Sequence, residues 1–357
     1  MQDARGAFPL SLFSPPSRER KQAVKRNDGI DCLRGILIIL VVAGHYAWPS
    51  PAVHHVIFLF HMPMFLMLSG WLLDRDKCMT WAWLGRRAAL LLVPYAVYLT
   101  MDMVLVRRTV GREMLLRCLW GGRALGGIYW YVTCFLVALL ILRFWWRFFS
   151  DRTVCLLALL AGAAAVMESH WIAQTGRMAF PGVPGNADVA LLAVVYLVVG
   201  FYGRERLRRW LEEENRRLDW AAVGTAVALT VFCWWNVSRE TPFYSFDMKQ
   251  VIYPELGLAL LLPCAFFLVF LRLIHWGSRR KGLRPLKRFL AFCGRNSLPI
   301  MFLHVPLNML LSRWLSYGGA LYLLIGVGAP LIVSQTLGRW RPARFLLGLP
   351  KQEGKTD

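Results

Sequence analysis

Charged residues are scarce in this chain, and acidic residues are the scarcest of them. Asp, Glu, Lys and Arg make up 18% of the 357 residues, and the 21 acidic residues number half as many as the 42 basic ones. A typical soluble domain is about 25% charged. Hydrophobic residues make up 57% of this chain, and the mean hydropathy is +0.45. The low charge and the high hydropathy exclude an ordinary soluble globular protein.

Several sequence patterns are also missing. None of the eight cysteines belongs to a Cys-x-x-Cys pair, which favours buried packing residues over a disulfide framework, and no metal site is predicted. There is no visible internal repeat and no polar segment long enough to fold as a separate soluble domain. The basic residues 1–28 precede an apolar run that lacks a small-residue cleavage pattern. We therefore expect a disordered cytoplasmic tail there and no cleaved signal peptide.

The chain consists mainly of a series of apolar runs. A helix needs about 20 apolar residues to cross the hydrocarbon core, and ten runs reach or approach that length when their flanks are included. They cover residues 36–48, 53–73, 88–106, 126–144, 154–166, 187–201, 220–237, 251–274, 298–315 and 320–337. We predict an all-α polytopic membrane protein with about ten transmembrane helices. Residues 29–340 form its membrane domain, residues 341–357 form a cytoplasmic tail, and a bacterial copy is expected in the inner (plasma) membrane.

The net charge of +21 follows this predicted topology. If both ends are cytoplasmic, 33 of the 42 Lys and Arg residues lie in cytoplasmic segments, as the positive-inside rule requires. This distribution favours membrane lipids as partners and argues against nucleic acid. One outer loop departs from it, because it holds five arginines: Arg107, Arg108, Arg112, Arg117 and Arg123. Either the third span is misplaced or this loop meets an anionic partner.

The first predicted helix carries three ionisable residues on one face. From Arg34 to His45 a helix makes three turns plus about 20° and rises about 16 Å, and Asp31 lies about 60° from Arg34. Ionisable groups in a bilayer are costly, so they are functional candidates. Arg34 is expected at the cytoplasmic interface. His45 is expected past the midplane, where a neutral imidazole suits a general base. Alternatively, His45 only donates a hydrogen bond to a carbonyl, and Arg34 extends to the interface.

The second predicted helix is interrupted by a proline. Pro63 cannot donate to the carbonyl of Leu59, so a kink and a free acceptor are expected there. His61 lies beside this break. The nearby methionines either pack in the core or line a slot for a flexible thioester arm.

Four ordered motifs resemble those of a family of integral-membrane O-acyltransferases, acyltransferase family 3. The motifs are Asp31-x-x-Arg34-Gly with ten residues between Arg34 and His45, Phe60-His61-Met62-Pro63-x-Phe65-x-x-x-Ser69-Gly70, Tyr129-Trp130-Tyr131-Val132, and Gly294-Arg295-Asn296-Ser297-Leu298-x5-His304. The second motif is most similar to that of the fucose 4-O-acetylase-like sugar acetyltransferases. The resemblance extends from about residue 28 to residue 304.

The resemblance implies transfer of an acyl group, usually acetyl from acetyl-CoA, to a hydroxyl of a cell-surface glycan or its lipid-linked precursor. It makes His45 the catalytic residue and Arg34 the arginine of the same catalytic motif. Asp31 is a further catalytic candidate because it could pair with Arg34. The family's cytoplasmic arginines before the third span commonly read Arg-x-x-Arg, whereas Arg86 and Arg87 are adjacent here. These two arginines and Arg34 are candidates to hold the donor phosphates.

Two further residues are candidates for donor binding. They are His61 and Asn296, whose amide could steady the oxyanion that forms on the thioester. His304 either approaches the same cavity or forms a hydrogen bond between helices. Acetyl-CoA is expected as a donor substrate, and no permanently bound cofactor is expected.

The residues leave mechanism and function class open. His45 either takes the acceptor proton or is itself acetylated and passes the group outward. A transporter or flippase of a lipid-linked glycan would also show ten spans, a Pro-broken helix and intramembrane His and Arg residues. The crowding of polar motifs into the first two spans speaks against it. A binding or sensing protein would use the same pocket without chemistry.

Overall fold

The computed structural model describes residues 28–108, 111–112, 116–117, 120–123, 128–176, 183–213 and 215–350. Its elements are α1 (Asp28–Gly44), α2 (Ala52–Phe58), α3 (His61–Trp71), α4 (Arg75–Cys78), α5 (Trp81–Met101), η2 (Asp102–Arg107), α7 (Tyr129–Phe148), α8 (Asp151–Thr175), η4 (Pro184–Asn186), α9 (Ala187–Glu212), α10 (Arg216–Val237), α11 (Leu256–Ser278), η5 (Lys281–Leu283), α12 (Arg284–Arg295), α13 (Ser297–Leu311), α14 (Gly319–Leu337) and α15 (Arg341–Leu346). The described residues form no strand, apart from an isolated bridge between Asp247 and Ile252. The predicted all-α class is confirmed.

Within the described residues, each of the ten predicted apolar runs falls largely on helices. Among the described residues, eight helical stretches are long and apolar enough to cross a membrane. The two other predicted spans correspond to α1, with 17 residues, and α13, with 15. The chain is therefore a multi-pass membrane protein, and its described residues contain eight full-length candidate spans. Of the two predicted tails, residues 1–27 and 351–357 lie outside the described residues, whereas the first part of the C-terminal tail forms the short helix α15 (Arg341–Leu346). The orientation in the membrane stays a prediction.

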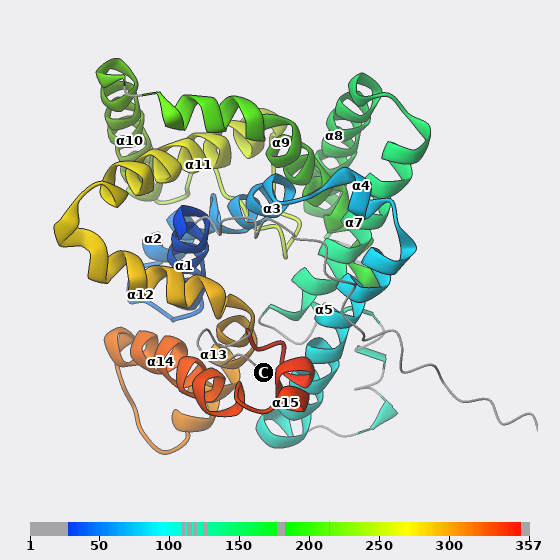
Figure 1. The fold of residues 1–357 in the computed structure, drawn as a ribbon, viewed down its shortest axis with the longest axis vertical. Helices are drawn as coiled ribbons and strands as arrows, with labels where there is room; N and C mark the ends of the chain where they lie inside the picture. Colours follow the sequence, from blue (N-terminus) through cyan, green and yellow to red (C-terminus); the bar gives the residue numbers. More distant parts are fainter. Residues whose placement is uncertain are drawn as a thin grey trace, which may run out of the picture.

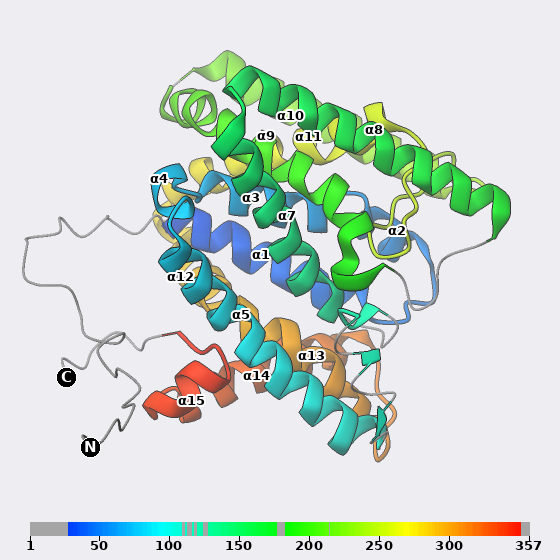
Figure 2. The ribbon, with the colours of Figure 1, turned by 90° about the vertical axis from the view of Figure 1, so that its right-hand side faces the viewer.

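Helix α1 lies in the interior of the bundle, with α3, α11, α12 and α13 around it (Figures 1 and 2). Its closest neighbour is α12, an amphipathic helix in the basic segment between two predicted spans. A Cβ added to Gly35 would overlap the carbonyl of Leu290, and one added to Gly294 would overlap the carbonyl of Asp31. The two backbones therefore cross in direct contact, which only glycine permits.

The chain breaks between α2 and α3, where the sequence predicts a kink. Helix α2 ends at Phe58, and α3 begins at His61, so Pro63 occupies the first turn of α3. A proline is tolerated there because the first N–H groups of a helix have no partner within the helix. The predicted kink is confirmed, and it places His61 at the start of the new helix.

The third predicted span is continuous. Helix α5 passes directly into the π-helical turn η2, so the helical stretch runs from Trp81 to Arg107. Two arginines of the basic segment after it have carboxylate partners within the chain. Arg107 Nε lies 3.1 Å from Asp102 Oδ2, and Arg123 forms an ion pair with Asp188. The structure thus supports the placement of this span, and part of the loop's charge is neutralised internally.

Candidate active site

Arg34 lies in the second turn of α1, and His45 lies just past the end of this helix. The helix ends at Gly44, but a tight turn continues it, because the backbone N–H of His45 donates to the Val42 carbonyl at 3.2 Å. A Cβ on Gly44 would lie 3.1 Å from the Phe58 ring. The small residue therefore allows α2 to pack closely beside His45. Arg34 and His45 are separated by about 16 Å along the helix axis.

A cavity of about 360 Å³ opens at the His45 end of α1, and we name it the His45 cavity. Its walls come from the end of α1, from α2 and α3, from the start of α7 and from the loop between α10 and α11. They are lined by Gly44, His45, Tyr46, Ala47, His54, Phe58, His61, Met62, Ile128, Trp130, Asp247, Met248, Lys249 and Gln250. The cavity brings together His45 and His61, the two histidines singled out in the first two predicted helices.

Hydrogen bonds to backbone carbonyls fix the tautomer of these two imidazoles. The Nδ1 atom of His45 lies 2.8 Å from the Val41 carbonyl oxygen, and Nδ1 of His61 lies 2.8 Å from that of Ile57. A carbonyl oxygen only accepts, so Nδ1 must carry the proton in both rings. In the neutral form the lone pair is then on Nε2. In its neutral form, His45 therefore has an unprotonated Nε2, and the hydrogen bond to the Val41 carbonyl orients the ring.

His304 is the third histidine in this region. Its ring meets that of His45 edge to face, with centroids 5.0 Å apart. The side chain is fully buried, and its Nδ1 lies 2.9 Å from the Ile300 carbonyl oxygen. Within the described part of the chain, its Nε2 has no hydrogen-bond partner. His304 thus packs directly against the candidate base, which favours its approach to the site over a bond between helices.

A second cavity, of about 220 Å³, lies at the other end of α1, and we name it the Arg34 cavity. Apolar side chains make up most of its wall. Its polar lining consists of Arg34, Ser69, Arg87, Tyr131 and Ser297. Both arginines line this one space, so their charges converge on it. A cavity with two guanidinium groups and an otherwise apolar wall suits an anionic molecule with an apolar arm.

The structure separates the two adjacent arginines of α5. Arg87 lines the Arg34 cavity, and its buried Nε has no hydrogen-bond partner among the described residues. Arg86 is exposed and does not line the cavity. Consecutive residues on a helix point about 100° apart, so only one of the two can face the same space. Of the predicted arginine pair, Arg87 is placed to meet a donor.

The two cavities meet along α1. Met62 and Ile128 line both of them. A methionine side chain has three rotatable bonds and adapts to its surroundings, so the division between the cavities is narrow and deformable. The two arginines and His45 thus lie in neighbouring cavities of the bundle, with Met62 and Ile128 at the boundary.

Besides Arg86, two other predicted site residues lie away from both cavities. Asp31 is buried beside α12, next to Gly294. Asn296 is also buried: its Nδ2 donates to the Phe292 carbonyl at 2.9 Å, and its Oδ1 accepts from the Ser334 hydroxyl. The structure thus places Asn296 in a contact between α13 and α14. Its neighbour Ser297 lines the Arg34 cavity in its stead.

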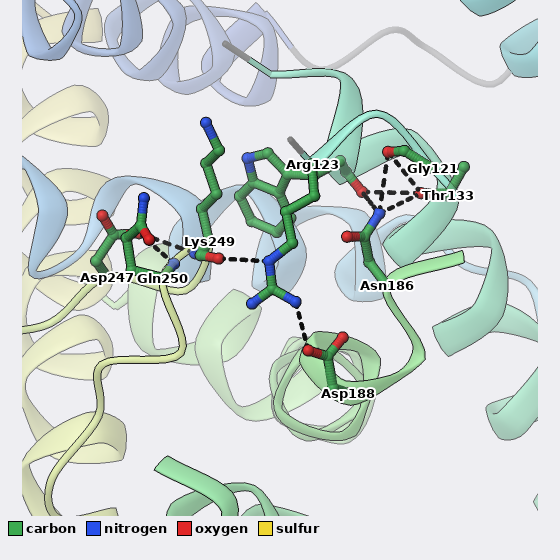
Figure 3. Close-up of polar contacts among 9 residues, drawn as sticks. Gly121, Arg123, Thr133, Asn186, Asp188, Asp247, Lys249 and Gln250 are labelled. Atoms are coloured by element: carbon green, nitrogen blue, oxygen red, sulfur yellow. Dashed lines mark hydrogen bonds and ion pairs between the residues drawn. The ribbon is translucent and has the colours of Figure 1, made fainter. Parts of the chain in front are cut away.

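One group of cavity residues was not anticipated from the sequence. Asp247, Lys249 and Gln250 reach the His45 cavity from the loop between α10 and α11. Figure 3 shows that Arg123 holds this loop from behind, since its Nε donates to the Lys249 carbonyl at 2.7 Å. The sequence signal for them was weak. Asp247 and Lys249 are a pair of oppositely charged residues in a short loop between predicted spans, and such pairs are common on protein surfaces.

The comparison with protein families gave one match. Residues 27–339 match the model of a family described as an acyltransferase domain, acyltransferase family 3. The comparisons with curated proteins and with solved structures gave no significant match. The finer resemblance to the fucose 4-O-acetylase-like enzymes stays a prediction. Because the match covers well over half of its length, this membrane protein belongs to acyltransferase family 3.

Proposed function

We propose that the protein transfers an acyl group, in the first place acetyl, from acyl-CoA to a hydroxyl of a cell-surface glycan or its lipid-linked precursor. The observation that carries the proposal is the pair of adjoining cavities along α1. One contains Arg34 and Arg87, and the other contains His45. Family membership supports the acyl transfer, and the chemistry of the two cavities supports the choice of donor and acceptor.

The donor fits the Arg34 cavity. Acyl-CoA is made in the cytosol, and the predicted orientation places this cavity on the cytoplasmic side. Guanidinium groups bind phosphates through charge-assisted hydrogen bonds. Arg87 has a buried donor atom without a partner among the described residues. The pantetheine arm would pass between the apolar walls toward Met62 and bring the thioester to His45.

The acceptor fits the His45 cavity. Nε2 of His45 takes the proton as the hydroxyl oxygen attacks the thioester carbonyl, and it returns the proton to the departing CoA thiolate. The ester C–O bond forms as the C–S bond breaks. In the covalent variant, Nε2 itself attacks the thioester carbonyl, the C–S bond breaks and CoA leaves as the thiolate. The acceptor oxygen then attacks the acyl carbonyl, the bond between that carbon and Nε2 breaks, and the hydroxyl proton passes to the thiolate. Either course requires the Nδ1 proton on the Val41 side, as the structure has it.

A transporter or flippase of a lipid-linked glycan is the alternative function. It would use connected cavities to pass its substrate without breaking a bond. Purified protein supplied with acetyl-CoA labelled in the acetyl group and with delipidated envelope glycan separates the two functions. Label that appears as an alkali-labile ester on the glycan supports the enzyme, whereas intact acetyl-CoA under every condition would count for the transporter.

Replacement of Arg87 by leucine tests the donor site. We expect the KM for acetyl-CoA to rise about tenfold to a hundredfold, because hydrogen bonds to charged groups contribute about 1.5–3 kcal/mol. The matched control is Arg86→Leu, which removes the same charge from the exposed neighbouring position and should leave the KM within about twofold. Equal effects in the two variants would show that net positive charge, and not the cavity, attracts the donor.

A further inference from the structure

The loop between α10 and α11 contains a turn that several hydrogen bonds hold in one conformation. At residues 247–252, the backbone of Asp247 both donates to and accepts from Ile252, at 2.8 and 2.9 Å. Oδ1 of Asp247 accepts from the backbone N–H groups of Lys249 and Gln250, at 2.8 and 3.2 Å. Val251 has a φ of +56° and is buried. A β-branched residue is strained in this left-handed region and stays there only where its surroundings hold it.

Contacts from three other segments hold the loop in place. Figure 3 shows Arg123 between the turn and α9, where it bonds the Lys249 carbonyl and pairs with Asp188. Both charged side chains of this ion pair are 5% exposed. Asn236 of α10 forms two hydrogen bonds with the backbone of Tyr244, at 2.8 and 2.9 Å. From α8, the Ser169 hydroxyl accepts from the N–H of Tyr253 at 3.1 Å. Burying an ion pair and straining the backbone both cost free energy. Their presence together suggests that the conformation of this loop matters for function.

The turn presents polar side chains to the candidate base. Asp247, Lys249 and Gln250 line the same cavity as His45. Among the described residues, no carboxylate forms an ion pair with Lys249, whose side chain extends away from Asp247 (Figure 3). Burial lowers the pKa of Lys249, and the positive charges of Arg123 and Arg107 add to this effect, while Asp247 opposes it. An anion bound beside the Lys249 ammonium would offset the cost of burying this charge.

Building on the proposed transfer, we infer that the turn at residues 247–250 recognises the acceptor and that Lys249 selects a hydroxyl compound carrying a carboxylate or a phosphate. The ammonium group binds the anion, and the free carboxylate oxygen of Asp247 and the amide of Gln250 suit neighbouring hydroxyls. The acceptor hydroxyl is then held beside Nε2 of His45. The acceptor class is thus an acidic sugar, either a uronic acid or a sugar phosphate.

Chemical labelling of Lys249 tests this binding without requiring turnover. The full-length protein in detergent is treated with an amine-reactive reagent at pH 8, and the modified peptides are followed by mass spectrometry. The ligands are glucuronic acid, glucose 6-phosphate and methyl glucoside. The first two represent the two sources of negative charge, and the third is neutral. We expect an acidic sugar to slow the modification of Lys249 about tenfold or more, as a charge-assisted contact would, and methyl glucoside to leave it unchanged. Lys281, which is exposed in η5, is the internal control.

Two outcomes would overturn the inference. One is a labelling rate that neither acid changes. The other is equal protection by the neutral sugar, which would indicate a site that does not read charge. The labelling experiment measures binding and not acyl transfer. Either result would therefore contradict this inference without contradicting the proposed function, which the acyl-transfer assay tests.

The transfer assay supplies an independent readout, with two substitutions of Lys249 of which one keeps the positive charge. With the envelope glycan as acceptor, Lys249→Gln should raise the acceptor KM about tenfold or more and change kcat less than threefold, since it removes a binding charge. Lys249→Arg should restore most of the affinity. A loss of kcat in both variants with an unchanged KM would assign Lys249 a purely structural role and contradict the inference.

Discussion

Replacing His45 by glutamine is expected to lower acyl transfer about 10²- to 10⁴-fold, the usual contribution of a positioned general base. Glutamine fills a similar volume and can still donate to the Val41 carbonyl, but its amide is not basic and cannot accept the proton that the imidazole Nε2 would take. The expected loss is therefore in kcat. Binding of CoA in the Arg34 cavity, measured by calorimetry on the purified protein, should stay within about twofold, because that cavity does not include His45.

A neighbouring histidine provides the matched control for this experiment. His55 lies on α2, one residue from His54, and does not line the His45 cavity. His55→Gln makes the same chemical change nearby and should leave kcat close to that of the unmodified protein. If both variants lose activity and both unfold at lower temperature, the imidazole of His45 is a packing residue, and the proposed chemistry has to be abandoned.

The same variant separates direct transfer from the covalent variant. In the covalent course, protein incubated with labelled acetyl-CoA and no acceptor should acquire label on His45, and this label should be released by hydroxylamine. His45→Gln should acquire none. In direct transfer, neither protein acquires label, although the unmodified protein still acetylates the glycan when the acceptor is supplied.

The features predicted from the sequence were those that depend on local periodicity. The apolar runs specified the helices because a span needs a continuous apolar stretch, and Pro63 specified the break before it. The stripe of Arg34 and His45 followed from the helical repeat alone. Both residues line cavities of the structure. The apolar length of a span, the break at a proline and the helical repeat are properties of a single helix and do not depend on its neighbours.

The features that were not predicted depend on contacts between distant segments. The choice between Arg86 and Arg87 is set by the rotation of α5 against its neighbours, which no local pattern encodes. Asn296 has the chemistry of an oxyanion donor, but a hydroxyl 38 positions away, on Ser334, occupies its oxygen. Lys249 lines the same cavity as His45 only because α1, α10 and α11 share one bundle. Site residues on a single helix are thus more predictable than those that tertiary packing brings together.

Helix α3 carries His61 and Met62 into the site, and its position depends on two glycines. A Cβ on Gly200 of α9 would overlap the Met67 carbonyl of α3, and one on Gly70 of α3 would overlap the Leu197 carbonyl of α9. The two helices therefore contact each other backbone to backbone at both points. A carbonyl cannot rotate away as a side chain can, so a methyl group at either glycine would force the helices apart.

Gly200→Ala is accordingly expected to destabilise the protein by about 3 kcal/mol or more, at or above the upper end of overpacking costs. The measurement is thermal unfolding in detergent, followed by the exposure of buried cysteines to a thiol-reactive dye. Gly203→Ala is the matched control on the same helix. Its added Cβ would lie 3.6 Å from Leu207 Cδ1, the end of a flexible side chain. Alanine should be neutral there or stabilising by up to about 1 kcal/mol, because glycine is the poorer helix former. Equal stability of the two variants would mean that α3 and α9 are not locked together. His61 and Met62 would then have no fixed position beside His45, and the junction of the two cavities would lose its structural basis.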